Sequence, residues 1–186
     1  MVGIPELWLP ILLSAVIVFV ASSIIHMVLP YHKGDYRKIP QEEKFAEAVR
    51  PMGLAPGTYH IPHCDSQKEM KSPEFQEKMK QGPNALLIVF PNGLPNMAKY
   101  LGTWFVYCLV VSFFVAYLTG RTLAPGAHYL AVFRVAGTAA FLGYAMAHAH
   151  NSIWRGERWG TTLKFYVDGL VYGLLTAGTF GWLWPR

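Results

Sequence analysis

The chain has 186 residues, 53% of them hydrophobic, and a mean hydropathy of +0.26. These values are high for a soluble globular domain, because the apolar residues occur in long runs. The formal net charge of +5 comes largely from basic residues that flank these runs, which indicates contact with anionic lipid rather than with nucleic acid. We therefore expect an integral membrane protein that has the lipid bilayer as its partner and binds no nucleic acid.

Four apolar runs are long enough to cross the hydrocarbon core, which requires about 20 apolar residues in a helix. They cover residues 7–29, 100–119, 129–149 and 163–184. Backbone groups in lipid must be hydrogen-bonded within their own segment, so each run is predicted to be a helix. The first run lacks the basic start and the short apolar core of a signal peptide, so we expect it to remain as an anchor.

The predicted fold class is an all-α membrane protein with four transmembrane helices and a small α+β cytoplasmic cap between the first and second spans. Its expected parts are the first transmembrane helix (1–29), the cap segment (30–99) and a region of three transmembrane helices (100–186). Ten of the 16 Lys and Arg residues lie between the first two spans, and such residues favour the cytoplasmic side. Both termini are therefore predicted to lie outside.

The cap segment carries the signals of two short helices and a small sheet. Residues 40–53 and 72–82 each read as a helix, the second with Ser72 as its N-cap and Pro73 in the first helical position. The apolar run at 85–90 is too short to span a membrane and fits a buried strand. A two-stranded sheet lying against the bilayer is expected, in which Tyr59 and Ile61 pair with Leu86, Ile88 or Phe90.

The same segment contains the sequence "HIPHCD", which brings together four side chains that suit zinc or a similar metal: His60, His63, Cys64 and Asp65. A structural zinc site needs four ligands, and no second pair at a recognisable spacing follows in the cap. Ordinary polar contacts in a turn are sufficient to explain the motif, so a metal site here is the weaker of the two interpretations.

A second group of ionisable residues is predicted at the inner ends of the spans, where charge is costly and therefore informative. An intramembrane polar cluster is expected there from four residues: His26, His148, His150 and Asp168. Side chains two positions apart on a helix point about 200° apart, so only one of His148 and His150 should face the bundle. We expect this to be His150. The alternatives are a hydrogen-bonded cluster, with Lys164 bonded to Asp168 along the helix, or a metal, haem or proton-handling site.

Small residues recur every four positions in the last two spans. In the fourth span they are Gly169, Gly173, Ala177 and Gly181, and in the third span the pattern is centred on Gly143. Such stripes allow two helix backbones to approach closely. The sequence therefore predicts that the third and fourth spans are tightly packed neighbours, although the same stripe could also mediate oligomers.

Several segments are similar to those of a family of uncharacterised bacterial inner-membrane proteins with four spans. They are "LPYHKGDYRKIP", "LAPGTY", "FRVAGTAAFLGYAMAHAHNSIW" and "LLTAGTFGWLWP". The resemblance covers most of the chain and contains no catalytic signature. It implies a multi-pass protein of the bacterial inner membrane and says nothing about chemistry.

No nucleotide-binding loop, nucleophile triad or redox pair of cysteines is present, so an enzyme is not expected. The leading hypothesis is a non-catalytic subunit or scaffold of a larger membrane assembly, with other membrane proteins as partners. One alternative is a metal- or haem-binding membrane protein that uses the inner-side histidines. A second is a small oligomeric transporter or channel.

Overall fold

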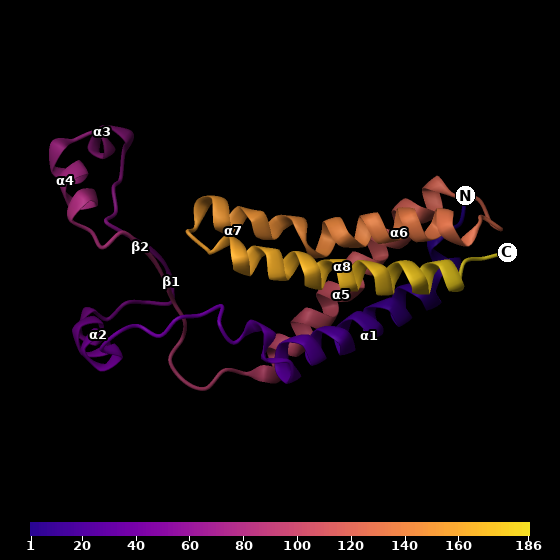
Figure 1. The fold of residues 1–186 in the computed structure, drawn as a ribbon, viewed down its shortest axis with the longest axis horizontal. Coiled ribbons are helices and arrows are strands. Elements are labelled where there is room, and N and C mark those ends of the chain that lie inside the picture. Colours follow the sequence, from indigo (N-terminus) through magenta and orange to yellow (C-terminus); the bar gives the residue numbers. More distant parts are fainter. The chain divides into compact units, whose positions relative to one another are not determined.

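The computed structural model describes residues 1–186, and the chain divides into two compact units (Figure 1). The first unit, called the bundle below, joins Met1–Tyr36 to Asn96–Arg186. The second unit, called the cap, is Arg37–Pro95. The connection at residues 30–36, which the sequence grouped with the cap, thus belongs to the bundle.

The bundle is made of four long helices with irregular turns at two of their ends. The helices are α1 (Trp8–Ser23), α5 (Met97–Thr122), α6 (Tyr129–Tyr144) and α8 (Trp159–Trp182). A π-helical turn, Ile24–Val28, extends α1. A 3-10 turn, Met146–His148, and the short helix α7 (Ala149–Trp154) follow α6. These turns matter because both lie at the end of the bundle that contains the candidate site.

The four helices form a closed ring in which α1 and α6 each pack against both α5 and α8. Neighbours run antiparallel: the Val2 amide donates to the Gly120 carbonyl at one end of α1 and α5, and Trp104 Nε1 donates to Ser22 Oγ (2.7 Å) towards the other. This is the up-and-down arrangement of a four-helix bundle, which builds its sites in the core from facing helices.

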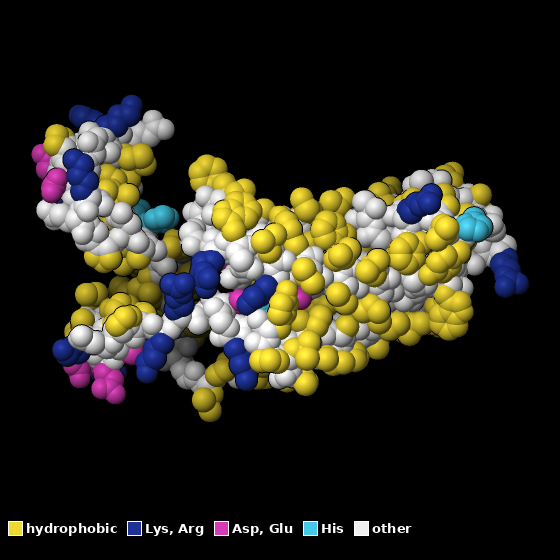
Figure 2. Space-filling view, in the orientation of Figure 1, with side chains coloured by type: hydrophobic (Ala, Val, Ile, Leu, Met, Phe, Trp, Pro, Cys, Tyr) yellow, Lys and Arg dark blue, Asp and Glu magenta, His cyan; other side chains and the backbone are white.

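Three helical segments are long and apolar enough to cross a membrane: Ile4–Val28, Met97–Thr122 and Tyr129–Trp154. Hydrophobic side chains cover much of the visible face of the bundle, whereas charged side chains are concentrated on the cap and at the two ends of the bundle (Figure 2). A multi-pass protein in a lipid bilayer fits these features. The fourth predicted span is α8, which is less apolar because it carries Lys164, Asp168 and many Gly and Thr residues. Its crossing of the bilayer stays a prediction.

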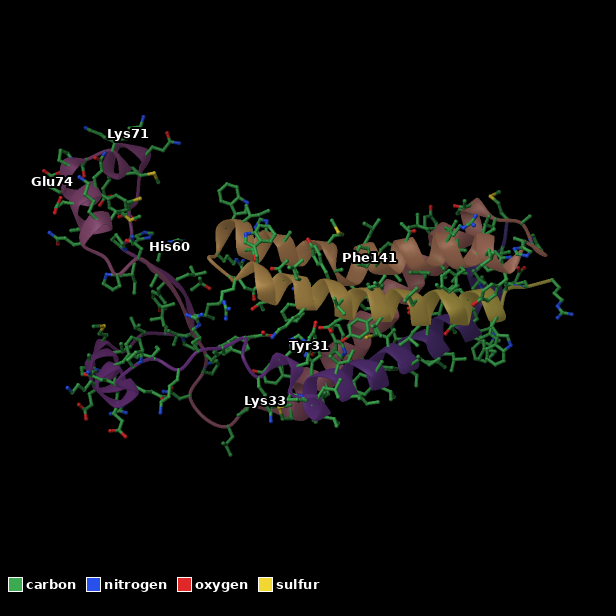
Figure 3. The ribbon with its side chains drawn as sticks, viewed as in Figure 1. Tyr31, Lys33, His60, Lys71, Glu74 and Phe141 are labelled. Carbon is green, nitrogen blue, oxygen red and sulfur yellow. The ribbon has the colours of Figure 1, made fainter.

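Glycines of α8 bring α6 and α8 close together. A Cβ on Gly169 would lie 2.6 Å from the Ala145 Cβ, and one on Gly173 would lie 3.2 Å from the Gly137 carbonyl oxygen and 3.4 Å from the Cβ of Phe141, which Figure 3 labels on α6. Two further residues of the predicted stripe also face α6: Ala177, against Gly137, and Gly181, against the Tyr129 ring.

Gly143 does not belong to this interface. A Cβ on Gly143 would lie 3.0 Å from Val111 Cγ1 of α5. The residues of α6 that face α8 include Gly137, Phe141 and Ala145, and a residue two positions from these is rotated about 200° around the helix. Gly143 therefore packs the third helix against the second rather than against the fourth.

The cap contains three short helices, α2 (Glu42–Val49), α3 (Gln67–Met70) and α4 (Pro73–Gln81), and two strands, β1 (Gly57–Ile61) and β2 (Ala85–Val89). The predicted N-cap of α4 is confirmed, because Ser72 Oγ accepts a hydrogen bond from the Phe75 amide (3.1 Å). No residue of the cap is buried. Its order therefore comes from local hydrogen bonds and partly covered side chains.

The two strands pair antiparallel, but the predicted register is wrong. Tyr59 pairs with Leu87, and Ile61 pairs with Ala85, while Phe90 lies beyond the strand. Twenty-three residues separate β1 from β2, so no tight turn sets the register, and both faces of the sheet are largely exposed. Under those conditions the hydrophobic pattern specifies register only weakly.

Candidate functional site

The candidate site is a group of ionisable side chains at the end of the bundle where α1 finishes and α5 begins. We call it the His–Asp cluster, and its members are His26, His32, Asp35, Lys164 and Asp168. All five lie in the bundle unit. His26 lies in the π turn that extends α1, and His32 and Asp35 lie in the connection that follows. Lys164 and Asp168 lie on α8.

Two irregular turns place the histidines. His26 lies in the π-helical turn Ile24–Val28, which ends with a hydrogen bond from the Leu29 amide to the Ile24 carbonyl (3.1 Å). Single π turns of this kind occur frequently at functional sites. Pro30 then begins a 3-10 turn that includes His32, and the two imidazole rings stack with their centroids 4.3 Å apart.

His32 bridges two carboxylates. Its Nδ1 lies 2.5 Å from Asp35 Oδ2, and its Nε2 lies 2.9 Å from Asp168 Oδ2. A neutral imidazole has only one N–H, so both contacts are hydrogen bonds from the ring only when it is an imidazolium. His26 approaches the same Asp168 oxygen at 3.9 Å through its Nε2.

Lys164 balances part of the negative charge. Its Nζ donates to Asp35 Oδ1 (2.5 Å) and to the carbonyl of Tyr31 (2.8 Å). Tyr31, labelled in Figure 3, lies in the connection after α1. The expected Lys164–Asp168 bond along α8 is therefore replaced by contacts with the connection after α1. Burial alone would raise the pKa of the Asp35 carboxyl, but hydrogen bonds from Lys164 and His32 outweigh it and hold that pKa below its ordinary 3.8.

A cavity of about 280 Å³ lies beside Asp168 and is lined by all four long helices of the ring. Most of its wall is apolar and aromatic, and its polar side chains include His26, Asp168 and His148. We call it the aromatic pocket. A concave, mainly apolar pocket with a few convergent polar groups is the usual form of a small-molecule site.

His148, rather than the expected His150, faces the interior. His148 lines the aromatic pocket and stacks on Phe165 with ring centroids 4.3 Å apart, whereas His150 is exposed. The expectation assumed a regular helix through both residues. The structure has a break at Ala145 and a 3-10 turn at Met146–His148, which change the direction in which each side chain points.

The "HIPHCD" residues are not brought together as metal ligands. His60 is exposed on β1, in the cap (Figure 3), and His63 Nε2 contacts Asp65 Oδ1 at 3.1 Å. The group of three potential ligand atoms in the protein is instead formed by His26, His32 and Asp168. Cys64 is a free thiol that takes no part in it.

His32 and Asp35 are the two cluster members that the sequence analysis missed. They occur in "PYHKGD", directly after the first span, where a His and an Asp three residues apart can meet within one turn. Their distance from Asp168 along the chain gives no hint that they share its environment. One signal was available: the motif directly follows the inner end of the first span, and Asp168 was already expected at the same depth in the membrane.

Comparisons of the chain with protein-family models, with curated proteins and with solved structures find no match. The chemistry of the His–Asp cluster has two forms: a charge-paired cluster centred on an imidazolium, or a metal centre in which two imidazoles and one carboxylate hold an ion.

Proposed function

We propose that the protein is a metal-binding membrane protein, with one divalent transition-metal ion, zinc or iron(II), held by His26, His32 and Asp168. The observation that supports it most strongly is that one ligand atom from each residue lies within 4.8 Å of the other two. The three residues come from the end of α1, from the connection after it and from α8. Metal sites in helical bundles are commonly built in this way, from side chains of different helices that point inward.

The two separations that involve Asp168 suit a single ion. Ligands at about 2.1 Å from a metal lie about 3.0 Å apart at neighbouring octahedral positions and about 3.4 Å apart at tetrahedral ones. Asp168 Oδ2 lies 2.9 Å from His32 Nε2 and 3.9 Å from His26 Nε2, which brackets both values. Two imidazoles and one carboxylate with free positions form the ligand set of many iron(II) sites and also resemble catalytic zinc sites.

The surroundings of His32 support the same proposal. Asp35 contacts Nδ1 of this ring, and a carboxylate in that position fixes the tautomer whose Nε2 lone pair faces a metal. Lys164 holds Asp35 in turn, through its second carboxylate oxygen. Outer partners of this kind orient a ligand before the ion arrives, so the arrangement is more than a chance meeting of three side chains.

The aromatic pocket supplies room for a further ligand. His26 and Asp168 both line it, so an ion bound to them would have an open position facing the cavity. Three protein ligands with one open position are typical of ions that bind a substrate rather than only stabilise a fold. A haem is not proposed, because a cavity of about 280 Å³ has room for one substituted ring and a porphyrin contains four.

Metal content of purified protein tests this proposal. We expect close to one equivalent of zinc or iron by elemental analysis after incubation with the ion and removal of the excess. We expect Asp168→Asn to lose most of it, since the amide is a weak ligand. His150→Ala and His63→Ala remove exposed histidines outside the cluster and should retain the metal.

The melting temperature of each variant in a chelator separates lost ligation from lost folding. Absence of stoichiometric metal in the wild-type protein would refute the proposal. Equal metal retention by Asp168→Asn and by His150→Ala would also refute it.

A second candidate is the role of a subunit in a membrane assembly, and one observation favours it. The cap has exposed apolar side chains and no buried residue. A small two-stranded sheet with short helices is marginally stable without a covered hydrophobic face. We propose that a partner protein covers the cap. Native purification that yields the protein without any stoichiometric partner would contradict this role.

The proposed setting is a bacterial inner membrane, with α8 as the fourth span, the cap in the cytoplasm and both termini outside. The distribution of Lys and Arg supports this orientation. Cysteine labelling tests this orientation. One variant carries Ser66→Cys in the cap, and another carries a cysteine inserted directly after Met1. Both are made in a chain without its natural cysteines. A membrane-impermeant reagent that reaches the Ser66 position but not the N-terminal one in intact cells would reverse the topology.

A further inference from the structure

We infer that the aromatic pocket binds the ring of a lipid-soluble compound that carries an oxygen substituent, of the quinone or quinol class. The binding of the ring stands on the pocket alone. A contact between its oxygen and the metal rests on the function proposed above, and the experiment below separates the two.

The size of the pocket indicates a ring with substituents. An apolar cavity of about 150 Å³ in another protein accommodates a benzene molecule. The aromatic pocket, at about 280 Å³, therefore has room for a six-membered ring together with small substituents.

The walls of the pocket favour a flat ligand. Trp104, Tyr144 and Tyr172 approach one another with ring centroids 5.5 to 6.4 Å apart, and Phe165 lines the same space. Rings from three helices thus surround the cavity, and aromatic pairs prefer edge-to-face or offset arrangements of this kind. A planar ring entering the cavity would continue these contacts, which a flexible acyl chain would not.

One end of the pocket suits an oxygen atom. His26 Nε2 lies 3.4 Å from Tyr172 Oη and 3.9 Å from Asp168 Oδ2. This end offers hydrogen-bond donors to a carbonyl oxygen and an acceptor to a hydroxyl group. It is also where the proposed metal would have its open position. Most of the surface of the pocket is apolar.

Two residues of the lining connect the pocket with the surface of the bundle. Met27 lines the pocket and is 66% exposed, and Leu101 of α5 lines it and is half-buried. The pocket is therefore bordered by apolar side chains that reach the outer surface of helices suited to a bilayer. An apolar tail attached to the ring could leave the pocket along them, which is why we assign a lipid-soluble compound rather than a water-soluble phenol.

A benzoquinone with a decyl tail is the probe, and dodecanol, which has a tail without a ring, is the control ligand. Saturable binding of one probe per chain is expected from isothermal titration in detergent, with no competition by dodecanol. Trp104→Ala should weaken binding about tenfold, the loss expected for one aromatic contact. Trp182→Ala removes an exposed tryptophan of α8 outside the pocket and should leave binding unchanged.

Leu101→Trp is a second variant, which fills the pocket without removing a wall. If Trp104→Ala fails to fold by its melting curve, Leu101→Trp carries the test, and it should abolish binding. Lack of saturable binding, equal competition by dodecanol, or unchanged binding in Leu101→Trp would each overturn the inference.

Chelator treatment separates the two proposals. Loss of the metal with weaker probe binding supports the contact between the oxygen and the metal. Loss of the metal with unchanged probe binding overturns that contact and leaves the ring site standing. Probe binding by a protein that never contains metal refutes the proposed metal centre, and the elemental analysis reports this independently.

Discussion

The bundle and the cap each contain a His–Asp pair, and the two pairs differ in how far they are exposed to solvent. In the bundle, His32 lies 2.5 Å from Asp35, and their side chains are 13% and 5% exposed. In the cap, His63 lies 3.1 Å from Asp65, and their side chains are 66% and 90% exposed. Exposed pairs contribute little because water screens them, whereas a buried pair must be satisfied by further partners.

Those further partners exist only in the bundle. Lys164 and Asp168 complete the His32–Asp35 pair from α8, while the cap pair has contacts within its own turn. The difference follows from burial: every buried residue of the protein lies in the bundle. A binding site requires such fixed surroundings, which the bundle has and the cap lacks.

Hydrogen exchange should give the largest contrast between the two units. We expect amides of β1 in the cap to exchange about 1,000-fold faster than those in the middle of α5, because exchange in a unit without a core requires only local opening. Mass spectrometry after exchange of the purified protein in detergent measures this. Similar protection in both units would show that the cap has a stabilising contact that burial does not reveal, and would remove the contrast drawn here.

The packing of α8 against α6 should give the next largest effect. Gly169→Leu places a side chain where even a Cβ would lie 2.6 Å from the Ala145 Cβ and 3.2 Å from its Cα. We expect a loss of about 3 kcal/mol or more in the free energy of unfolding, since backbone must move.

Gly160→Leu is the matched control on the same helix, because nothing lies within 4 Å of a Cβ at Gly160. Its melting temperature in detergent should stay near that of the wild type. Equal melting temperatures for Gly169→Leu and Gly160→Leu would contradict the close approach of the two helices.

The two His–Asp pairs themselves provide the third test. Asp35→Asn keeps the shape of the side chain but removes the charge that orients His32, and loss of such an outer partner typically lowers metal affinity 10- to 100-fold, about 1.4 to 2.7 kcal/mol. Asp65→Asn makes the same change beside His63 and should leave the affinity unchanged. Competition with a chromophoric chelator measures both. A similar loss in the two variants would mean that the effect is not specific to the buried pair.

The helices of the bundle could be predicted from the sequence because a long apolar run marks each of them, although only three are long and apolar enough to cross a membrane. Segment 100–119 falls inside α5, and 129–149 begins with α6 at Tyr129. Local signals were equally reliable, as Ser72 shows. The orientation of His148 and His150 was not predictable, because the helix breaks at Ala145, where the chain packs closely against Gly169 of α8. Such a tertiary contact leaves no pattern in the local sequence.

The cluster could be predicted only in part for a related reason. Depth along the spans predicts that His26 and Asp168 lie close together, and the structure places His26 Nε2 3.9 Å from Asp168 Oδ2. His32 and Asp35 join them because the chain turns back at Pro30, and a turn into contact with α8 is a tertiary event. Residues beyond the end of a span therefore need to be considered as part of the same site when the connection begins with a tight turn.

A buried hydrogen bond between α1 and α5 should give the smallest effect. Ser14 Oγ donates to the Pro10 carbonyl (2.6 Å) and lies 3.0 Å from Ser112 Oγ. Because the single hydroxyl proton of Ser14 is used on Pro10, Ser112 is the donor in the bond between the helices. Interhelical hydrogen bonds of this kind in a membrane protein contribute about 0.6 kcal/mol on average, because polar groups also find partners in the unfolded state within the membrane.

A double-mutant cycle measures this contribution directly. We expect Ser14→Ala and Ser112→Ala to couple by about 0.6 kcal/mol in the free energy of unfolding. Ser23→Ala is the control for the first substitution, because Ser23 Oγ donates only to the Phe19 carbonyl of its own helix and should not couple to Ser112. A coupling energy above about 2 kcal/mol would lie beyond the range measured for such bonds. It would mean that polar contacts, rather than the close packing of small residues, make the bundle more stable than the cap.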